Sequence, residues 1–463
     1  MKTRFFFLFL YVIWSPHFAK AQQIVPEWLT RLYTQLETQN KDLQIAKMNT
    51  AFNIEELTVS EAYLYPSLSL SGSAGKSKNQ NLPVSSTSVS SSTGSSSSSG
   101  LGVDTSNPTT TSNSTNTDGI SGQLSMNYTL FSHFAVSENI KKSENSVQQA
   151  KLQENANRIK KKAQLIQLLN QWQWLVEVEP LLHSAQKILQ QVEEHSNKKA
   201  KNLYSDSDWL DLEEKRAKVA LTIIKFEEGK ELVKKALIDL ISDLDFNTLN
   251  DVPVFTINYK PPTSIELLNL YKEKSDSWKI SQLQIDTARR TERVTDWQRP
   301  YIPIVSTSLS QAYSRPYESD KTSDSWSAQV VLTFNLFDGF SQSARRQQAK
   351  IAHSFTQAKA DSEAQKKVVY LQHERMKALV ANAEFNEKNV NIKKKVLQKN
   401  DVLKKHDQGV AGPLEIALAD LEVAKSKIDA LEALKDFQVS LLNIATELNE
   451  FDKIIITSDK RTN

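Results

Sequence analysis

The segment QLSMNYTLF, which runs from Gln123 to Phe131, alternates polar and apolar residues almost to its end. A period of two predicts a β-strand that has one polar face and one apolar face. Three further segments alternate in the same way, and small polar residues occupy most of their polar positions. The four predicted strands span about residues 64–74, 122–131, 301–313 and 326–337.

This alternation is typical of transmembrane β-barrel strands, whose apolar face contacts lipid and whose polar face lines the lumen. A half-buried sheet of a water-soluble protein would show the same alternation, so both interpretations stay open. In a membrane, four strands cannot close a barrel, because the smallest closed barrels have about eight strands and open edges are not tolerated in lipid. The membrane interpretation therefore predicts that copies of the chain share a barrel, and a trimer would supply twelve strands.

The chain contains an internal repeat. The segment GQLSMNYTLFSHF, residues 122–134, matches AQVVLTFNLFDGF, residues 328–340, and Pro66 matches Pro303 upstream. Each repeat should contain a helix, two strands and a long helical hairpin. The fold class is therefore α+β.

The repeat divides the chain into predicted segments. They are a first repeat at 22–250, a linker at 251–262, a second repeat at 263–451 and a tail at 452–463. The first repeat is longer because it contains a serine-rich segment at 75–119. Its composition cannot bury an apolar core, so we expect a disordered loop.

Two very long helices are expected, from about 134 to 201 and from about 340 to 408, each roughly 100 Å long at 1.5 Å per residue. Apolar residues recur every seven positions in both, which favours coiled-coil packing. In the first helix these residues are Leu168, Leu175, Leu182 and Leu189. In the second they are Val369, Met376, Ala383, Val390 and Leu397. Pro180 should kink the first helix.

The N-terminus has the pattern of a secretory signal. Lys2 and Arg4 precede a short apolar run, and Ala19-Lys20-Ala21 forms an A-x-A cleavage site. We therefore expect a signal peptide at 1–21 and export of the mature chain. A membrane anchor is the alternative, although the apolar run is shorter than the roughly 20 residues that a helix needs to cross a bilayer.

Composition argues against several function classes. The 57 basic and 54 acidic residues nearly balance, which does not favour nucleic-acid binding. The chain has no cysteine, so it forms no disulfide and carries no lipid anchor on cysteine. Its seven histidines form no H-E-x-x-H motif, and no G-x-S-x-G or phosphate-binding glycine loop occurs. We expect no enzyme activity, no cofactor and no metal site.

The second helical hairpin breaks at HDQGVAGPLE, residues 406–415, where Gly409, Gly412 and Pro413 predict a stop and a restart. The counterpart in the first repeat is NLYSDSDW, residues 202–209, in which serine and aspartate supply the helix caps.

The signal peptide, the duplicated halves and the segments LFDGF and QGVAGPLEIALA together resemble the TolC family of outer-membrane efflux proteins. The resemblance covers about residues 30 to 450. It implies a homotrimer with a twelve-strand outer-membrane β-barrel above a periplasmic α-helical barrel of coiled-coil hairpins. It also implies docking through a periplasmic adaptor protein onto an inner-membrane transporter, for efflux or type I secretion. The serine-rich loop would then be extracellular.

The resemblance also implies a gate of acidic residues at the periplasmic entrance. The first acidic position of the family falls on Glu415, whereas the second falls on Leu418 and departs from the pattern. The repeat places Asp208 and Asp211 at the equivalent positions of the first hairpin. A ring of carboxylates would attract cations. Alternatively, Glu415 simply stabilises a helix N-terminus.

The hairpin tips should contact the adaptor, and the candidate residues there are Tyr204, His406, Gly409, Gly412 and Pro413. The family locks its closed tips with an arginine and a tyrosine, but Ala411 and His406 stand at those positions. His406 would then form a charge-assisted pair with a neighbouring acid, or it would be an exposed loop residue with no role.

A second hypothesis is a surface or periplasmic protein with a structural or adhesive role, built from coiled coils, with the serine-rich segment as a stalk. Such a protein has no need of strand pairs at matched positions in two halves. The strand pairs therefore favour an export duct.

Overall fold

The computed structural model describes residues 26–75, 119–132, 134–199, 206–244, 249, 255–298, 302–317 and 322–458. The predicted signal peptide and the serine-rich segment between residues 75 and 119 lie outside the described residues. The chain forms two compact units. Unit 1 comprises Met1–Glu55, Glu144–Arg289 and Ile351–Asn463, and unit 2 comprises Glu56–Ser143 and Arg290–Lys350.

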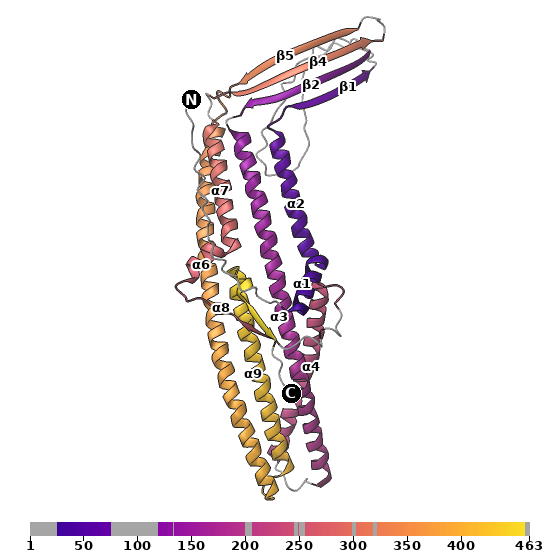
Figure 1. The fold of residues 1–463 in the computed structure, drawn as a ribbon, viewed down its shortest axis with the longest axis vertical. Coiled ribbons are helices and arrows are strands. Elements are labelled where there is room, and N and C mark those ends of the chain that lie inside the picture. The colour runs from indigo at the N-terminus through magenta and orange to yellow at the C-terminus, as the bar shows by residue number, and fades with distance from the viewer. Residues whose placement is uncertain are drawn as a thin grey trace, which may run out of the picture. The chain divides into compact units, whose positions relative to one another are not determined.

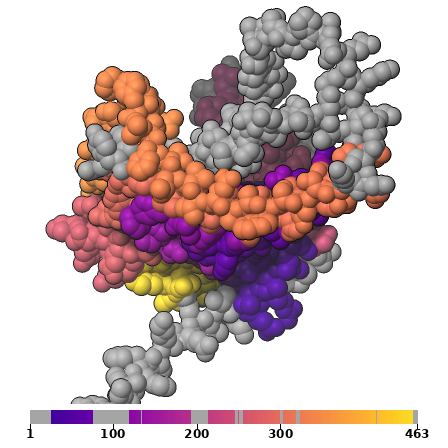
Figure 2. Space-filling view, turned by 90° about the horizontal axis from the view of Figure 1, so that it is seen from above, coloured from indigo at the N-terminus to yellow at the C-terminus, as the bar shows by residue number. Residues whose placement is uncertain are grey.

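Unit 2 contains a four-stranded antiparallel sheet in the order β1-β2-β4-β5 (Figure 1). Its strands are β1 (Ser67–Gly75), β2 (Gly119–Phe131), β4 (Ile304–Pro316) and β5 (Ser323–Thr333). In the space-filling view of Figure 2, the orange residues of β4 and β5 form a band beside the violet residues of β2. The two hairpins of the sheet come from the two repeats, so the repeats meet at the pairing of β2 with β4.

All four predicted strands start about three residues from the observed positions. β1 begins after Pro66 and β4 begins after Pro303, because proline cannot donate a ladder hydrogen bond. β5 ends at Thr333 rather than near residue 337, because Thr333 pairs with Ile304, the first residue of β4. The matched prolines therefore set the same boundary in both repeats.

The register separates two faces of the sheet. Directly paired residues share a face, and Ser69, Ser125, Ser310 and Ser327 form one row across all four strands. The hydroxyls of Ser69 and Ser125 are 2.7 Å apart, and those of Ser310 and Ser327 are 2.8 Å apart. We call this side the serine face.

The opposite side of the sheet is the apolar face. It carries Leu68, Leu70, Leu124, Met126, Leu309, Val330 and Leu332. A register shift between Thr129 and Phe131 places Phe131 opposite Val305 on this face. The predicted alternation therefore ends at Tyr128, and Leu130 is the extra residue of a β-bulge.

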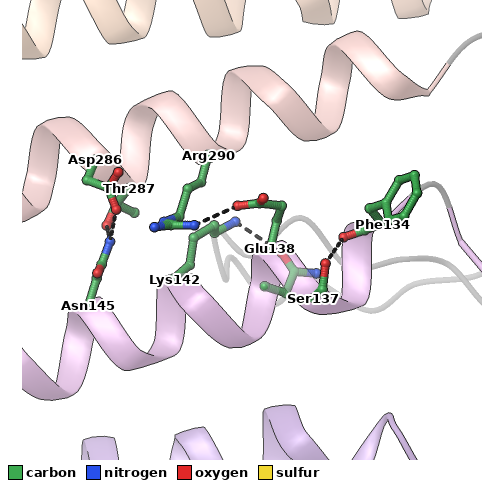
Figure 3. A network of polar contacts seen from close by, with 9 residues as sticks. Phe134, Ser137, Glu138, Lys142, Asn145, Asp286, Thr287 and Arg290 are labelled. Carbon is green, nitrogen blue, oxygen red and sulfur yellow. Dashed lines mark hydrogen bonds and ion pairs between the residues drawn. The ribbon is translucent and has the colours of Figure 1, made fainter.

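In unit 2 the helices below the strands also form a row. They are α2 (Lys41–Ala62), α3 (Ala135–Lys199), α7 (Asp276–Trp297) and α8 (Ser341–Asp407), which all continue into unit 1. The row order α2-α3-α7-α8 rests on three contacts: Ser60 to Ser143 at 2.7 Å, Arg290 to Glu138 at 2.9 Å and Arg346 to Asp296 at 3.4 Å. Figure 3 shows the buried Glu138 carboxylate and the Arg290 guanidinium pointing toward each other.

In unit 1 the lower helices form a row in the order α8-α9-α3-α4, with α9 spanning Pro413–Glu447 and α4 spanning Asp206–Leu240 (Figure 1). The order rests on contacts of Lys395 with Glu422, Lys399 with Asp420, Gln167 with Asn443, and Lys230 with Glu179. Helix α3 continues through Pro180.

The two predicted heptad patterns have different outcomes. In α3, Leu175, Leu182 and Leu189 are buried within the chain, and Leu168 is half-buried. In α8, Val369, Met376, Val390 and Leu397 are 56–66 % exposed, so they do not form a seam within the chain. Helix α8 instead packs on α9 through Ala364 and Leu371, which cluster with Ile444 and Leu448. We call the exposed residues Val369, Met376, Val390 and Leu397 the α8 stripe.

A small second sheet joins the segment predicted as a linker to the segment predicted as a tail. β3 (Phe255–Asn258) lies in the linker and pairs antiparallel with β6 (Ile455–Ser458) in the tail. Both strands are too short for alternation to predict them. Three short helices complete the described elements: α1 (Glu27–Gln39), α6 (Leu267–Lys274) and the 3-10 helix η1 (Phe451–Lys453).

Among the described residues, every helix is either too short or too polar to cross a bilayer.

Glu450 joins several of these segments. Its buried carboxylate accepts hydrogen bonds from Lys274 of α6 at 2.5 Å, Lys453 of η1 at 2.6 Å and the Tyr259 hydroxyl at 2.6 Å. Burial raises the pKa of Glu450, but the three hydrogen bonds outweigh burial and lower the pKa to about 2. The ionised carboxylate therefore stabilises the fold.

We predict that Glu450→Gln lowers stability near neutral pH by about 2–3 kcal/mol, because it removes a buried charge that three donors satisfy. A lowered pKa contributes stability that is present above the unfolded value near 4.5 and lost as pH falls toward about 2. Between those pH values, the midpoint temperature of thermal unfolding should change less steeply with pH in the variant than in the wild type. Glu387→Gln, at an exposed carboxylate of α8, should leave that dependence unchanged, and equal slopes for wild type and Glu450→Gln would contradict the prediction.

Candidate functional site

The tip between α8 and α9 is a helix stop built on glycine. Gly409 has a φ of +71°. Its N–H donates to the carbonyl of His406 at 2.8 Å, and the N–H of Val410 donates to the carbonyl of Lys405 at 2.8 Å. These two bonds form a Schellman motif, which satisfies the last carbonyls of α8. The predicted stop at Gly409 is therefore explained by backbone geometry.

The restart follows within four residues. Gly412 is the N-cap of α9, with φ −89° and ψ 164°, and Pro413 occupies the first helical turn. Proline fits there because its missing N–H would have no partner in the helix. Between the two glycines, Ala411 is buried and Val410 is 73 % exposed. The tip therefore presents an apolar side chain to its surroundings.

Glu415 lies in the first turn of α9 and is exposed. Its N–H donates to the carbonyl of Gly412 at 3.1 Å. A carboxylate in the first turn is favourable at a helix N-terminus, which is the alternative role that the sequence offers for Glu415. Leu418, one turn later, is half-buried.

The acidic residues of the first hairpin occupy matching backbone positions. Asp208 is the third residue of α4, as Glu415 is the third residue of α9. Asp211 lies one turn further along α4. Tyr204 lies outside the described residues. The repeat relation between the two hairpins therefore extends to their helix starts.

His406 does not form the hydrogen-bonded pair that one interpretation of the sequence predicted. Its Nδ1 is 3.9 Å from Oδ1 of Asp407, and both side chains are largely exposed. That distance is too long for a hydrogen bond. The two residues are adjacent on a helix, where neighbouring side chains point in different directions.

Sequence reasoning missed the ion pairs that join α8 to α9 above the tip. Lys399 lies 2.5 Å from Asp420, and Lys395 lies 3.1 Å from Glu422. The lysine-rich run was the available signal, because a basic helix face beside an acidic one favours pairing. These pairs are partly exposed, so each adds little stability, but they hold the two helices in register.

Within the described parts of the chain, no three histidine or acidic side chains are grouped closely enough to hold a metal ion.

No protein-family model and no curated protein matches the chain. Solved structures do match. A membrane protein from Pseudomonas aeruginosa is 14 % identical with a TM-score of 0.69, over 92 % of this chain and 91 % of the other. The CmeC outer membrane channel of Campylobacter jejuni is 15 % identical with a TM-score of 0.69, over 92 % and 86 %. The open MtrE outer membrane channel of Neisseria gonorrhoeae is 14 % identical with a TM-score of 0.66, over 92 % and 90 %.

These matches show that the single chain has the α+β fold expected from the resemblance to the TolC family. The chain has the fold of TolC-like outer-membrane channels along nearly its whole length.

We predict that Gly409→Ala destabilises the tip by about 1 kcal/mol, because alanine disfavours a positive φ. Hydrogen exchange at the amide of Val410, whose bond closes the motif, should accelerate about fivefold. Gly412→Ala is the matched control, since its φ of −89° suits alanine. Equal exchange rates in the two variants would show that the positive φ of Gly409 does not determine the stability of the tip.

Proposed function

We propose that this protein is an outer-membrane channel-tunnel, a passive export duct for small molecules or proteins that an inner-membrane transporter drives. One observation carries the proposal. In the sheet and in each row of helices, one edge element belongs to the first repeat, and the other edge element is α8 or the strand β5 that precedes it. Each edge exposes groups that a further copy of the chain would satisfy.

The sheet supports the barrel part of the proposal. β1 and β5 each pair on one side, so each leaves a row of backbone donors and acceptors open. Such edges are not tolerated in lipid, and a barrel removes them by closure. Three copies joined from β5 to β1 would give the twelve-strand barrel. The apolar face would then contact lipid, and the serine face would line the lumen.

The lower helical row supports a homotrimer built by head-to-tail contacts. Its edge helix α8 carries the α8 stripe, and its other edge helix, α4, exposes the α4 stripe of Leu210, Leu221, Ile224 and Ile238. Apolar residues at helical spacing on two different surfaces of one chain suit a heterologous interface, which closes into a ring. The α8 stripe of one copy would pack on the α4 stripe of the next.

The cellular setting follows from the same proposal. Residues 1–21 would direct export, the sheet would lie in the outer membrane, and the long hairpins would extend into the periplasm. The segment 75–119 would be an extracellular loop. A periplasmic adaptor protein would contact the hairpin tips, at Tyr204, His406 and the Gly409–Pro413 segment, and an inner-membrane transporter for efflux or type I secretion would supply the energy.

The gate is the most specific part of the proposal. Asp208 and Glu415 hold equivalent positions at the helix starts, and Asp211 follows one turn after Asp208. In a trimer, three copies of each would surround the entrance. Crowded carboxylates repel one another unless cations neutralise them, so the ring would favour cations.

Cell fractionation tests the proposal as a whole. The mature protein should be recovered with the outer membrane and should conduct ions after reconstitution into a bilayer. A water-soluble monomer in the periplasm would contradict the barrel and the duct, and would support the rival coiled-coil stalk protein.

The register predicts opposite results for two neighbouring positions of β5. Leu332→Arg places a charge on the apolar face near the end of β5, where it should cost about 1 kcal/mol in the membrane and reduce assembly. Thr333 lies on the serine face, so the Thr333→Arg protein should assemble normally. The yield of membrane-inserted oligomer measures both. Similar yields would show that the faces are not lipid and lumen.

The gate predicts a block by cations. Divalent cations added on the periplasmic side should block the reconstituted channel, and Asp208→Ala with Glu415→Ala should abolish the block and reduce cation selectivity. Asp401→Asn, at an exposed acid of α8, is the control and should keep the block. If these acids act only as helix caps, the double variant will be slightly less stable and its block will be unchanged.

A further inference from the structure

The serine face has an unusual composition for a surface that would meet water. Serine occupies more than half of its positions, and threonine, asparagine and glutamine supply the other polar side chains. At the 24 % charged fraction of the whole chain, a face of this size would carry about six charged side chains. Within the four described strands it carries none.

The charged residues of the four strands lie on the opposite side. Arg315 and Asp324 belong to the apolar face, because Arg315 pairs with Ile120 and Asp324 pairs with Tyr313. A charged side chain costs free energy on a face that contacts lipid, whereas water solvates it on a face that lines a lumen. Solvation therefore explains why the apolar face has so few charges, but it does not explain why the serine face has none.

The serine face is also the concave side of the sheet. A hollow of about 280 Å³ crosses all four strands, and its walls include Ser73, Ser121, Ser314 and Ser323. These four serines form one paired row of the register. A sheet that closes into a barrel curves toward its inner face, so this curvature supports the lumen position proposed for the serine face.

The hydroxyls of this face form many of their hydrogen bonds within the sheet. The hydroxyl oxygens of Ser73 and Ser121 lie 2.7 Å apart, as do those of Ser69 and Ser125. The Ser67 hydroxyl donates to a backbone carbonyl of β2 at 3.2 Å. Each such bond uses a donor that a passing molecule would otherwise bind. The face therefore offers hydrogen bonds to a solute without holding it strongly.

We propose that the serine face forms a charge-neutral exit of the duct, which anionic and cationic cargo leave equally fast. This inference rests on the proposed function and adds the class of cargo, which the sheet does not restrict to one sign of charge. A ring of charged side chains in a pore attracts ions of opposite sign and holds back ions of the same sign. A wall of hydroxyls does neither, and conduction also requires binding weak enough for the cargo to leave.

Because the chain has no cysteine, a single introduced thiol can report the local potential on the full-length protein in phospholipid vesicles. Ser327→Cys places the thiol on the serine face, and Ala328→Cys places it on the apolar face. Each variant is treated at low ionic strength, which reduces screening, with two methanethiosulfonates of similar size. One carries an anionic sulfonatoethyl group and the other a cationic trimethylammonioethyl group. Dividing each rate by the rate with 2-mercaptoethanol removes the intrinsic difference between the reagents.

The thiol at 327 should react with both reagents, and its two normalised rates should agree within about twofold. The thiol at 328 should react with neither, because lipid would cover it. Similar reactivity at 327 and 328, or none at 327, would contradict the barrel part of the proposed function. Normalised rates at 327 that differ by about tenfold would leave the barrel intact and overturn the neutral exit alone.

Added charge supplies the matched comparison. Ser310 lies directly opposite Ser327, so Ser310→Glu in the Ser327→Cys protein should raise the ratio of cationic to anionic rates about tenfold. Ser310→Lys should lower the ratio by a similar factor. Ser310→Gln has the size of the glutamate variant without its charge and should leave the ratio unchanged. If Ser310→Glu and Ser310→Gln give the same ratio, charge on this face does not act on passing ions, and the neutral exit has no effect on cargo.

Discussion

Within the described residues β1 and β5 each pair on one side only, and their open backbone edges are the constraint on which the rest of the molecule depends. A strand that pairs on one side leaves every second N–H and C=O without a partner, and only water, another strand or closure can satisfy them. The sheet is also exposed on both faces, one of hydroxyls and one of large apolar side chains. An isolated copy in water would expose the apolar face, and an isolated copy in lipid would expose the edges. Association of copies within a membrane removes both costs.

The same argument about open edges applies to the helices, because they belong to the same two repeats as the strands. The edge strand β5 leads into α8, an edge helix of both rows, and the edge strand β1 follows α2, the edge helix of the row in unit 2. Buried alanines bring α8 close to α9, while the large apolar residues of α8 remain on its open side. This distribution, with small residues facing α9 and large apolar residues on the open side of α8, is expected if the open side of α8 packs on another copy of the chain.

Much of the fold was predictable because its signals are long and local. Alternation over most of a strand revealed the sheet, and Gly409, Gly412 and Pro413 revealed the tip because each has a defined role in turn chemistry. β3 and β6 were missed because four residues hold too few periods. The partner of the α8 stripe was not predictable because a heptad pattern shows that a helix face is covered, but not by which chain. Phe134 and Phe340, just before α3 and α8, have positive φ values of 58° and 67°, which was not predictable because glycine is the residue that usually signals a positive φ.

The central claim is that the open edges of one copy close on the next, and a disulfide cross-link tests it most directly. Contacts along the lower row place Val390 of the α8 stripe and Ile224 of the α4 stripe within about one helical turn of the same level. Both side chains are more than half exposed. With Val390→Cys and Ile224→Cys in one chain, oxidation in the membrane should give covalent dimers and closed trimers, while either cysteine alone should give monomers. Cross-linking by a single variant, or none by the double variant, would contradict a head-to-tail ring.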